Sequence, residues 1–139
     1  MTEDTIKIES KYKNVDSVIN KVQQFAFENG VNKKQTGEIV ICVVEALNNI
    51  IKHGYLEKPG SFINIGFQKK DDIIKIQITD KGISRKNFTE PSFDFDPDDI
   101  QNIPEGGMGL YLIETLMDNN MYETIGDKNL FTMEKIVDS

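Results

Sequence analysis

Residues 45–55 read Glu-Ala-Leu-Asn-Asn-Ile-Ile-Lys-His-Gly-Tyr and form the expected end of an amphipathic helix. Glu45, Asn49 and His53 follow one another at intervals of four, so they share one polar face. A carboxylate can accept a proton, and an amide oxygen one turn later suits Mg²⁺ beside a phosphate. The same spacing is also typical of an ordinary solvated stripe. The opposite face carries apolar residues at helical spacing: Ile39, Val40, Val43, Leu47, Ile50 and Ile51.

The composition indicates an acidic chain with a core of its own. With 139 residues we expect a single domain over 1–139. The net charge of -7 argues against direct nucleic-acid binding, which depends on Lys and Arg, but allows a local nucleotide site. Cys42, the one cysteine, falls inside the apolar helix, and we expect it to be a buried small side chain.

No stretch approaches the length of a membrane span, and the first residues lack a charged-then-apolar leader. We therefore expect no membrane association and a cytoplasmic location.

The order of elements predicts an α/β (α+β) two-layer sandwich in which helices cover one face of a mixed, mostly antiparallel sheet. We expect a helix that Asn14 or Asp16 caps and Gly30 stops, and a central helix from a cap at Asn32 to Gly54. A loop holds three of the four prolines and spans 85–105; a loop of this length in a compact domain is usually functional or mobile. The expected strands are 5–10, 62–67, 73–79, 121–125 and 130–137, with turns at 69–72 and 126–129, and a third helix follows the loop.

Glycines open the third helix, where free backbone N–H groups can face a phosphate: Gly106, Gly107 and Gly109. They follow a long loop and not a strand, so neither the dinucleotide fingerprint nor the P-loop pattern fits.

Three segments together resemble one family. Residues 45–55 resemble the N box of the GHKL (Bergerat-fold, histidine-kinase-like) ATPase superfamily, 80–82 its first glycine box, and 106–118 its second. The Glu-Ala-x-x-Asn-x-x-x-His-Gly-Tyr form and the Leu-Met-Asp ending are similar to the bacterial anti-sigma-factor serine/threonine kinases, which act by partner switching. The resemblance covers nearly the whole chain and implies the Bergerat fold.

The resemblance also implies roles for matching residues. Glu45 would be the general base and Asn49 the ligand of Mg²⁺. Asp80 would accept a hydrogen bond from the adenine amino group of ATP, and Gly82 would leave room for the adenine ring. Residues 83–105 would form the ATP lid. Because phosphoryl transfer is mostly positioning and charge neutralisation, a base, a metal ligand and backbone donors are what it requires. The remaining nucleotide-binding candidates are His53, Gly106, Gly107, Met108, Gly109 and Leu110; His53 is alternatively a helix-end residue near the negative end of the dipole.

The chain departs from the family pattern at three places. Ser84 stands where the first glycine box usually has a second glycine, which would stiffen the start of the lid. Asn129 and Leu130 stand where the family often has an adenine-side threonine, and Thr132 comes later. Residues 103–105 carry no basic residue for the terminal phosphate, a role left to Arg85, Lys86 or a partner.

The function that the resemblance implies is phosphorylation of a serine or threonine on a STAS-type antagonist protein, alternating with binding of a sigma factor or another regulated protein. It also implies a homodimer. The alternative is an ATP-gated binding module with little or no kinase activity. A third hypothesis is the catalytic domain of a sensor histidine kinase. Such kinases need a phosphoacceptor histidine, and the only histidine of the sequence, His53, lies inside the N box, which argues against this hypothesis.

Overall fold

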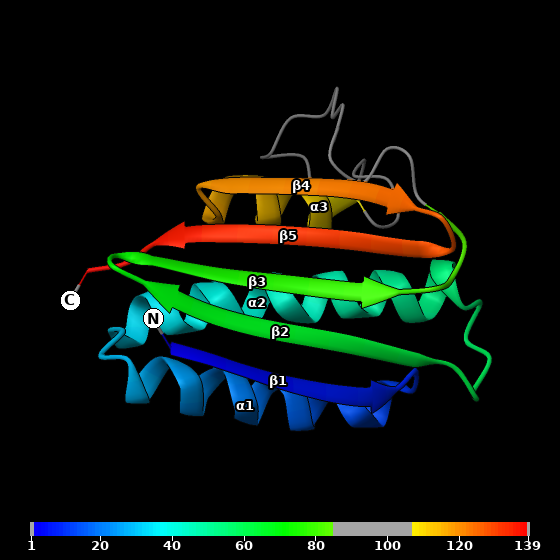
Figure 1. The fold of residues 1–139 in the computed structure, drawn as a ribbon, viewed down its shortest axis with the longest axis horizontal. Coiled ribbons are helices and arrows are strands. Elements are labelled where there is room, and N and C mark those ends of the chain that lie inside the picture. The colour runs from blue at the N-terminus through cyan, green and yellow to red at the C-terminus, as the bar shows by residue number, and fades with distance from the viewer. Residues whose placement is uncertain (1, 85–106, 139) are drawn as a thin grey trace.

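The computed structural model describes residues 2–84 and 107–138. Five antiparallel strands form one sheet in the order β1-β2-β3-β5-β4 (Figure 1). β5 lies between β3 and β4, so the β4–β5 hairpin pairs with the first three strands through β5. The strands are β1 (Thr2–Glu9), β2 (Phe62–Lys70), β3 (Ile73–Asp80), β4 (Asn119–Ile125) and β5 (Lys128–Ile136).

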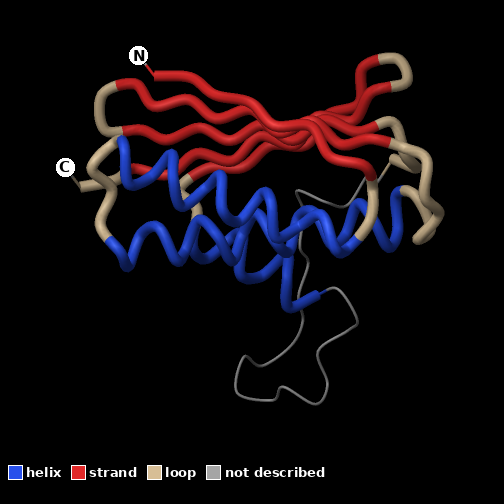
Figure 2. The backbone as a smooth tube through the Cα atoms, turned by 90° about the horizontal axis from the view of Figure 1, so that it is seen from below, coloured by secondary structure: helices blue, strands red, loops and turns tan. Residues whose placement is uncertain are grey.

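Three α-helices form a second layer on one face of the sheet, as Figure 2 shows. The other face is not covered by any described element. The predicted two-layer α/β sandwich is therefore confirmed, with antiparallel pairing throughout the described strands. The helices are α1 (Val15–Glu28), α2 (Lys33–Asn49) and α3 (Gly107–Leu116), with a short 3-10 turn η1 (Tyr12–Asn14) and a π-helical turn η2 (Ile50–Gly54).

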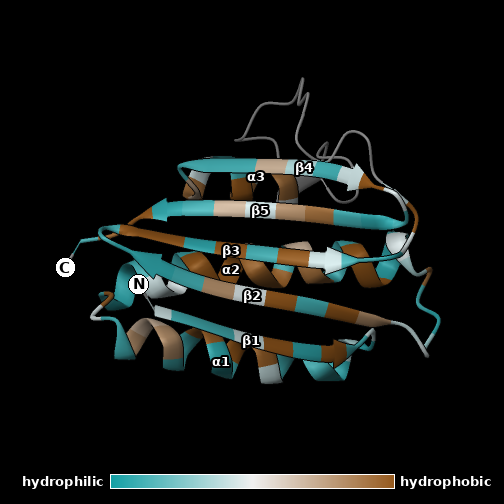
Figure 3. Ribbon diagram, viewed as in Figure 1, coloured by the Kyte–Doolittle hydropathy of each residue, from teal (hydrophilic) through white to brown (hydrophobic). Residues whose placement is uncertain are grey.

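The core lies between the two layers. Apolar residues alternate with polar ones along the strands (Figure 3), and the alternate residues Ile74, Ile76 and Ile78 of β3 are buried against the helices. The predicted apolar stripe of α2 is buried, apart from the partly exposed Val40. Cys42 is buried as expected, and burial raises the pKa of its thiol to about 12.

The helix ends agree with the sequence in two cases and differ in one. Asn32 caps α2 by accepting a hydrogen bond from Gln35 N at 2.8 Å. Gly30 follows α1 with a φ of +72°, a conformation that favours glycine. Asn14 lies at the N-cap position of α1, as predicted, but it makes no side-chain capping hydrogen bond and donates instead to the Glu9 carbonyl at 3.0 Å. The alternative cap, Asp16, lies inside the helix.

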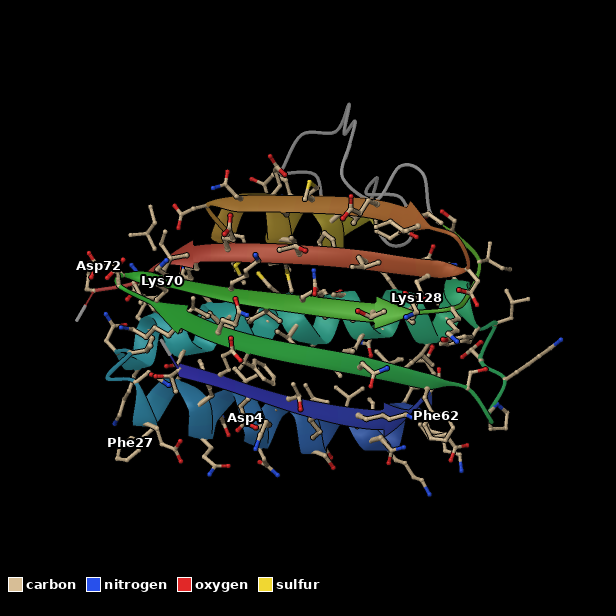
Figure 4. All side chains as sticks on the ribbon, in the orientation of Figure 1. Asp4, Phe27, Phe62, Lys70, Asp72 and Lys128 are labelled. Atoms are coloured by element: carbon tan, nitrogen blue, oxygen red, sulfur yellow. The ribbon has the colours of Figure 1, made fainter. Side chains whose placement is uncertain are left out.

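The strands are longer than the sequence predicts. β1 begins at Thr2, β2 runs to Lys70, β4 begins at Asn119 and β5 at Lys128. Polar residues at these ends continue the backbone ladder because each has a partner on the next strand. The β2–β3 turn lies at one end of the sheet, near Lys70 and Asp72, and Phe62 and Lys128 mark the opposite end (Figure 4).

Among the helices of the described ranges, none has the length and apolar content needed to cross a membrane.

Candidate functional site

The C-terminal end of the central helix changes its winding. After Asn49 the chain continues through the π turn η2, in which Tyr55 N donates to Ile50 O at 2.9 Å across five residues. The predicted helix therefore reaches Gly54, but its last turn is wider than an α-helix. Such turns are rare and frequently occur at functional sites. Half-buried His53 lies in this turn, and buried Gly54 ends it.

Gly54 meets the segment that follows β3. Ile83 N donates to Gly54 O at 2.9 Å. A Cβ atom at position 82 would lie 2.6 Å from Gly54 O and 2.7 Å from its carbonyl carbon. Only glycine allows this approach of two backbones, so Gly82 holds the end of β3 against the π turn.

Asp80 ends the core-facing row of β3 with a buried carboxylate. Its side chain follows Ile74, Ile76 and Ile78 in the alternation. Oδ1 accepts hydrogen bonds from Gly82 N at 2.8 Å and Asn129 Nδ2 at 3.0 Å. No described residue donates to Oδ2. Burial raises the pKa of Asp80, and the hydrogen bonds from Asn129 and Gly82 act in the opposite direction.

Asn129 is a site residue that the sequence left unassigned. The sheet register places Asp80 opposite Asn129, and Asn129 opposite Thr124, on three neighbouring strands. Asn129 is buried and bonds both Asp80 and Gly82 O, the latter at 2.8 Å. Thr132 points to the uncovered face, where Gln77 donates to it at 3.3 Å. The antiparallel register was the missing signal, because it pairs the start of β5 with the end of β3.

The second part of the site lies where α3 begins. A Cβ atom at Gly109 would be 2.6 Å from Oε2 of Glu45 and 3.3 Å from its Cδ. The Glu45 carboxylate therefore faces the N-terminal turn of α3, where helix N–H groups are free for an anion. Leu110, one residue further on, packs against the core.

Asn49 lies one turn after Glu45, and it is 7% exposed. Its Nδ2 atom has no hydrogen-bond partner among the described residues. A buried polar atom without a partner costs about 1–3 kcal/mol, so this carboxamide fits a bound group that would satisfy it. An asparagine can present either its oxygen or its nitrogen, and the choice follows the ligand.

The donor set suits magnesium better than a metal held by protein alone. Within residues 2–84 and 107–138, no cluster of three or more His, Cys, Asp or Glu side chains could hold a metal ion. Mg²⁺ typically takes one or two protein oxygens and completes its shell with waters and substrate phosphates. The Asn49 oxygen, one helical turn from the Glu45 carboxylate, is compatible with that arrangement.

The structure thus joins the three sequence segments through α2. Glu45 lies against Gly109 and Asn49 follows it one turn later, whereas the π turn that comes next contacts Gly82 and the Asp80 region. Gly107 begins α3. Residues 85–105 of the expected lid, Gly106 and the side chain of Met108 lie outside the described residues.

Comparisons with known proteins agree with this geometry. The family described as histidine kinase-like ATPase domain matches residues 8–135. The serine-protein kinase RsbW of Oceanobacillus iheyensis is 34% identical over 118 residues, 78% of this chain and 73% of that protein. RsbW of Staphylococcus aureus (strain MRSA252) is 47% identical over 83 residues, 56% of this chain and 52% of that protein. The chain therefore spans about half the length of the latter relative.

Solved structures share the fold at low sequence identity. The RsbU and RsbW domains of Rv1364c from Mycobacterium tuberculosis match with a TM-score of 0.71 at 14% identity, covering 99% of this chain and 32% of that one. The SiaB-SiaC complex from Pseudomonas aeruginosa matches with a TM-score of 0.62 at 9% identity, covering 95% and 89%. With a family match over almost its whole length, the chain belongs to the histidine kinase-like ATPase family.

Proposed function

We propose that the chain is an ATP-dependent serine/threonine protein kinase and anti-sigma-type regulator that acts by partner switching. It would phosphorylate a STAS-type antagonist and alternately hold a sigma factor or another regulated protein. Membership of the ATPase family and the names of its RsbW relatives support this proposal. The observation that carries it is the Glu45 carboxylate against the first turn of α3, one helical turn from the buried Asn49.

Glu45 is positioned to act as the base. The hydroxyl oxygen of the substrate bonds to the γ-phosphorus of ATP, and the bond from that phosphorus to the bridging oxygen breaks. The hydroxyl proton passes to the Glu45 carboxylate, and ADP leaves with the bridging oxygen. Gly109 keeps a side chain out of the space beside Glu45. The free N–H groups of this turn would stabilise negative charge on the phosphates.

Different residues of the site would hold the adenine ring and the metal. Oδ2 of Asp80 would accept a hydrogen bond from the adenine amino group, and Gly82 would leave room for the ring. Asn49 would hold Mg²⁺, which supplies charge neutralisation to the phosphates when bound. The remaining members of the proposed nucleotide-binding set are His53, Gly106, Gly107, Met108, Gly109 and Leu110.

The test incubates the purified chain with Mg²⁺ and ATP labelled at the γ-phosphate in an extract of its own cells. Glu45→Gln keeps the size of the side chain and removes the base. Glu114→Gln is a matched control, since Glu114 is an exposed carboxylate on α3 that accepts from Asn120. We expect a labelled small protein with the wild type and with Glu114→Gln, and none with Glu45→Gln. Undiminished labelling by Glu45→Gln would refute the role of Glu45.

A nucleotide-gated binding module is the second candidate. Ser84, at a position where the family usually has glycine, is hydrogen-bonded to Thr124 at 2.8 Å, which restrains the start of the expected lid. ATP would then set the affinity for a partner without phosphate transfer. Stoichiometric label on a partner would exclude this candidate; nucleotide-dependent capture of an unlabelled partner would favour it.

The homodimer implied by the resemblance stays a prediction. Light scattering at two protein concentrations, with and without ATP, would measure it.

A further inference from the structure

A chain of hydrogen bonds crosses three neighbouring strands and ends on the Asp80 carboxylate. Asn129 Nδ2 donates to Asp80 Oδ1 at 3.0 Å, and Thr124 Oγ1 donates to Asn129 Oδ1 at 2.9 Å. Ser84 Oγ lies 2.8 Å from Thr124 Oγ1. We call these four residues, Asp80, Asn129, Thr124 and Ser84, the Asp80 relay. It links the end of β3, the start of β5 and the edge strand β4.

The hydrogen bonds of the Asp80 relay all run in one direction, from Ser84 towards Asp80. A threonine hydroxyl carries one proton, and Thr124 gives it to Asn129, so Ser84 must donate to Thr124. Asn129 Nδ2 in turn donates hydrogen bonds to Asp80 and, at 2.8 Å, to Gly82 O. One continuous path of donors, from Ser84 through Thr124 and Asn129, therefore ends on the carboxylate. Hydrogen bonds aligned in this way polarise one another and favour the charged acceptor at their end.

This direction determines what Asp80 offers to a ligand. Oδ1 is engaged by Asn129 and by Gly82 N at 2.8 Å, which leaves Oδ2 as the oxygen that can meet a base. A charged carboxylate only accepts hydrogen bonds, whereas a protonated one can donate. A 6-amino purine presents a donor and a 6-oxo purine presents an acceptor. An ionised Asp80 can therefore hold a 6-amino purine through Oδ2, and a purine without the 6-amino group lacks that hydrogen bond.

We propose that the Asp80 relay sets the base selectivity of the site, with Asn129, Thr124 and Ser84 as positioning residues that hold Asp80 as an acceptor for a 6-amino purine. The inference rests on the proposed nucleotide function of the same site. None of the three residues needs to touch the nucleotide, because each acts through the next. A purely structural role would instead join the strand ends without affecting the choice of base.

The experiment measures binding of ATP, GTP and purine riboside triphosphate, which lacks the 6-amino group, to the whole chain by calorimetry with Mg²⁺. Thr124→Val removes the linking hydroxyl and keeps a side chain of similar shape at this exposed position, whereas Thr124→Ser keeps a hydroxyl there. Thr132→Val is the matched control, since its hydroxyl bonds Gln77 on the opposite face of the sheet. Asn129→Leu removes the direct donor to Asp80.

We expect the wild type to bind ATP more tightly than purine riboside triphosphate. Thr124→Val should reduce that ratio by about threefold to tenfold, and Asn129→Leu by about tenfold or more, because its lost bond ends on a charged group. Thr124→Ser and Thr132→Val should keep the wild-type ratio. GTP also lacks the 6-amino group, so the ratio of ATP to GTP affinity should fall in both relay variants.

An unchanged ratio of ATP to purine riboside triphosphate in Thr124→Val would overturn the relay. That variant decides the matter even if Asn129→Leu does not fold, because Thr124 lies on the edge strand and is exposed. If the wild type binds ATP and no variant alters the ratio, the relay is refuted and the kinase proposal stands. If the wild type binds no nucleotide, both are refuted together.

Discussion

Replacing Gly82 with alanine should separate the end of β3 from the π turn. The added Cβ would lie 2.6 Å from Gly54 O, 2.7 Å from Gly54 C and 3.0 Å from Gly54 Cα. All three atoms belong to backbone, so no side-chain rotation relieves the overlap. The two segments must move apart by most of an ångström to reach an ordinary carbon contact of about 3.5 Å.

The size of the effect follows from two hydrogen bonds that this movement breaks. Ile83 N donates to Gly54 O at 2.9 Å, and Gly82 N donates to the buried Asp80 carboxylate at 2.8 Å. A neutral hydrogen bond contributes about 0.5–1.5 kcal/mol and one to a charged group about 1.5–3 kcal/mol. Gly82→Ala should therefore lower the free energy of unfolding by about 2–4 kcal/mol. The melting temperature should fall by about 5–15 °C.

Urea unfolding followed by circular dichroism measures this change, with Gly37→Ala as the control. Gly37 lies exposed in α2, and its added Cβ would have no neighbour within 4 Å. Alanine there should stabilise the chain by about 0.5–1 kcal/mol, because glycine is a poor helix former. If Gly82→Ala unfolds like the wild type and binds ATP equally well, the close approach of Gly82 and Gly54 is not a constraint on the site.

Three further predictions separate catalysis, packing and ionisation. In Gly109→Ala the added Cβ would lie 2.6 Å from Oε2 of Glu45, the movable end of that side chain, and 3.3 Å from its Cδ. Rotation of the Glu45 side chain can relieve this contact, so stability should change by less than about 1 kcal/mol. Labelling of the substrate should fall by about 10- to 100-fold, and urea unfolding and γ-phosphate transfer measure the two effects. Lys135→Met removes the 2.6 Å bond from Lys135 Nζ to Leu116 O at the end of α3 and should lower unfolding free energy by about 1–3 kcal/mol; an unchanged urea midpoint would contradict this. Burial raises the pKa of Asp80 in the folded state, so ionisation of this carboxyl lowers the free energy of unfolding as the pH rises through that pKa. Asp80→Asn should therefore stabilise the chain at neutral pH. Urea titrations should show that the difference in unfolding free energy between variant and wild type shrinks towards about pH 3.

Much of the layer structure followed from periodicity. The stripe from Ile39 to Ile51 has the helical period, and Ile74, Ile76 and Ile78 have the period of a strand, so each buries one face. Asn32 and Gly30 marked helix ends because a cap and a positive φ are local properties. Asn14 lies at the predicted N-cap position but forms no capping hydrogen bond, because its side chain donates to a carbonyl of another element, that of Glu9.

The site was predictable in part. The sequence identified Glu45, Asn49, Asp80 and the glycines by their chemistry and their resemblance to known boxes, and the roles of these residues stay proposals. It gave no role to Asn129, whose partners are 49 and 47 positions away, Asp80 and Gly82. No local pattern contains that information.

The sequence alone determined the elements, the buried faces and the inventory of reactive side chains, because hydrophobic period, capping and functional-group chemistry reside in short stretches of chain. Only the tertiary structure decided which of those side chains meet. Sheet register set Asn129 beside Asp80, the π turn brought Gly54 against Gly82, and helix packing set Gly109 against Glu45. These contacts join residues far apart along the chain, and their geometry depends on how the layers pack as a whole.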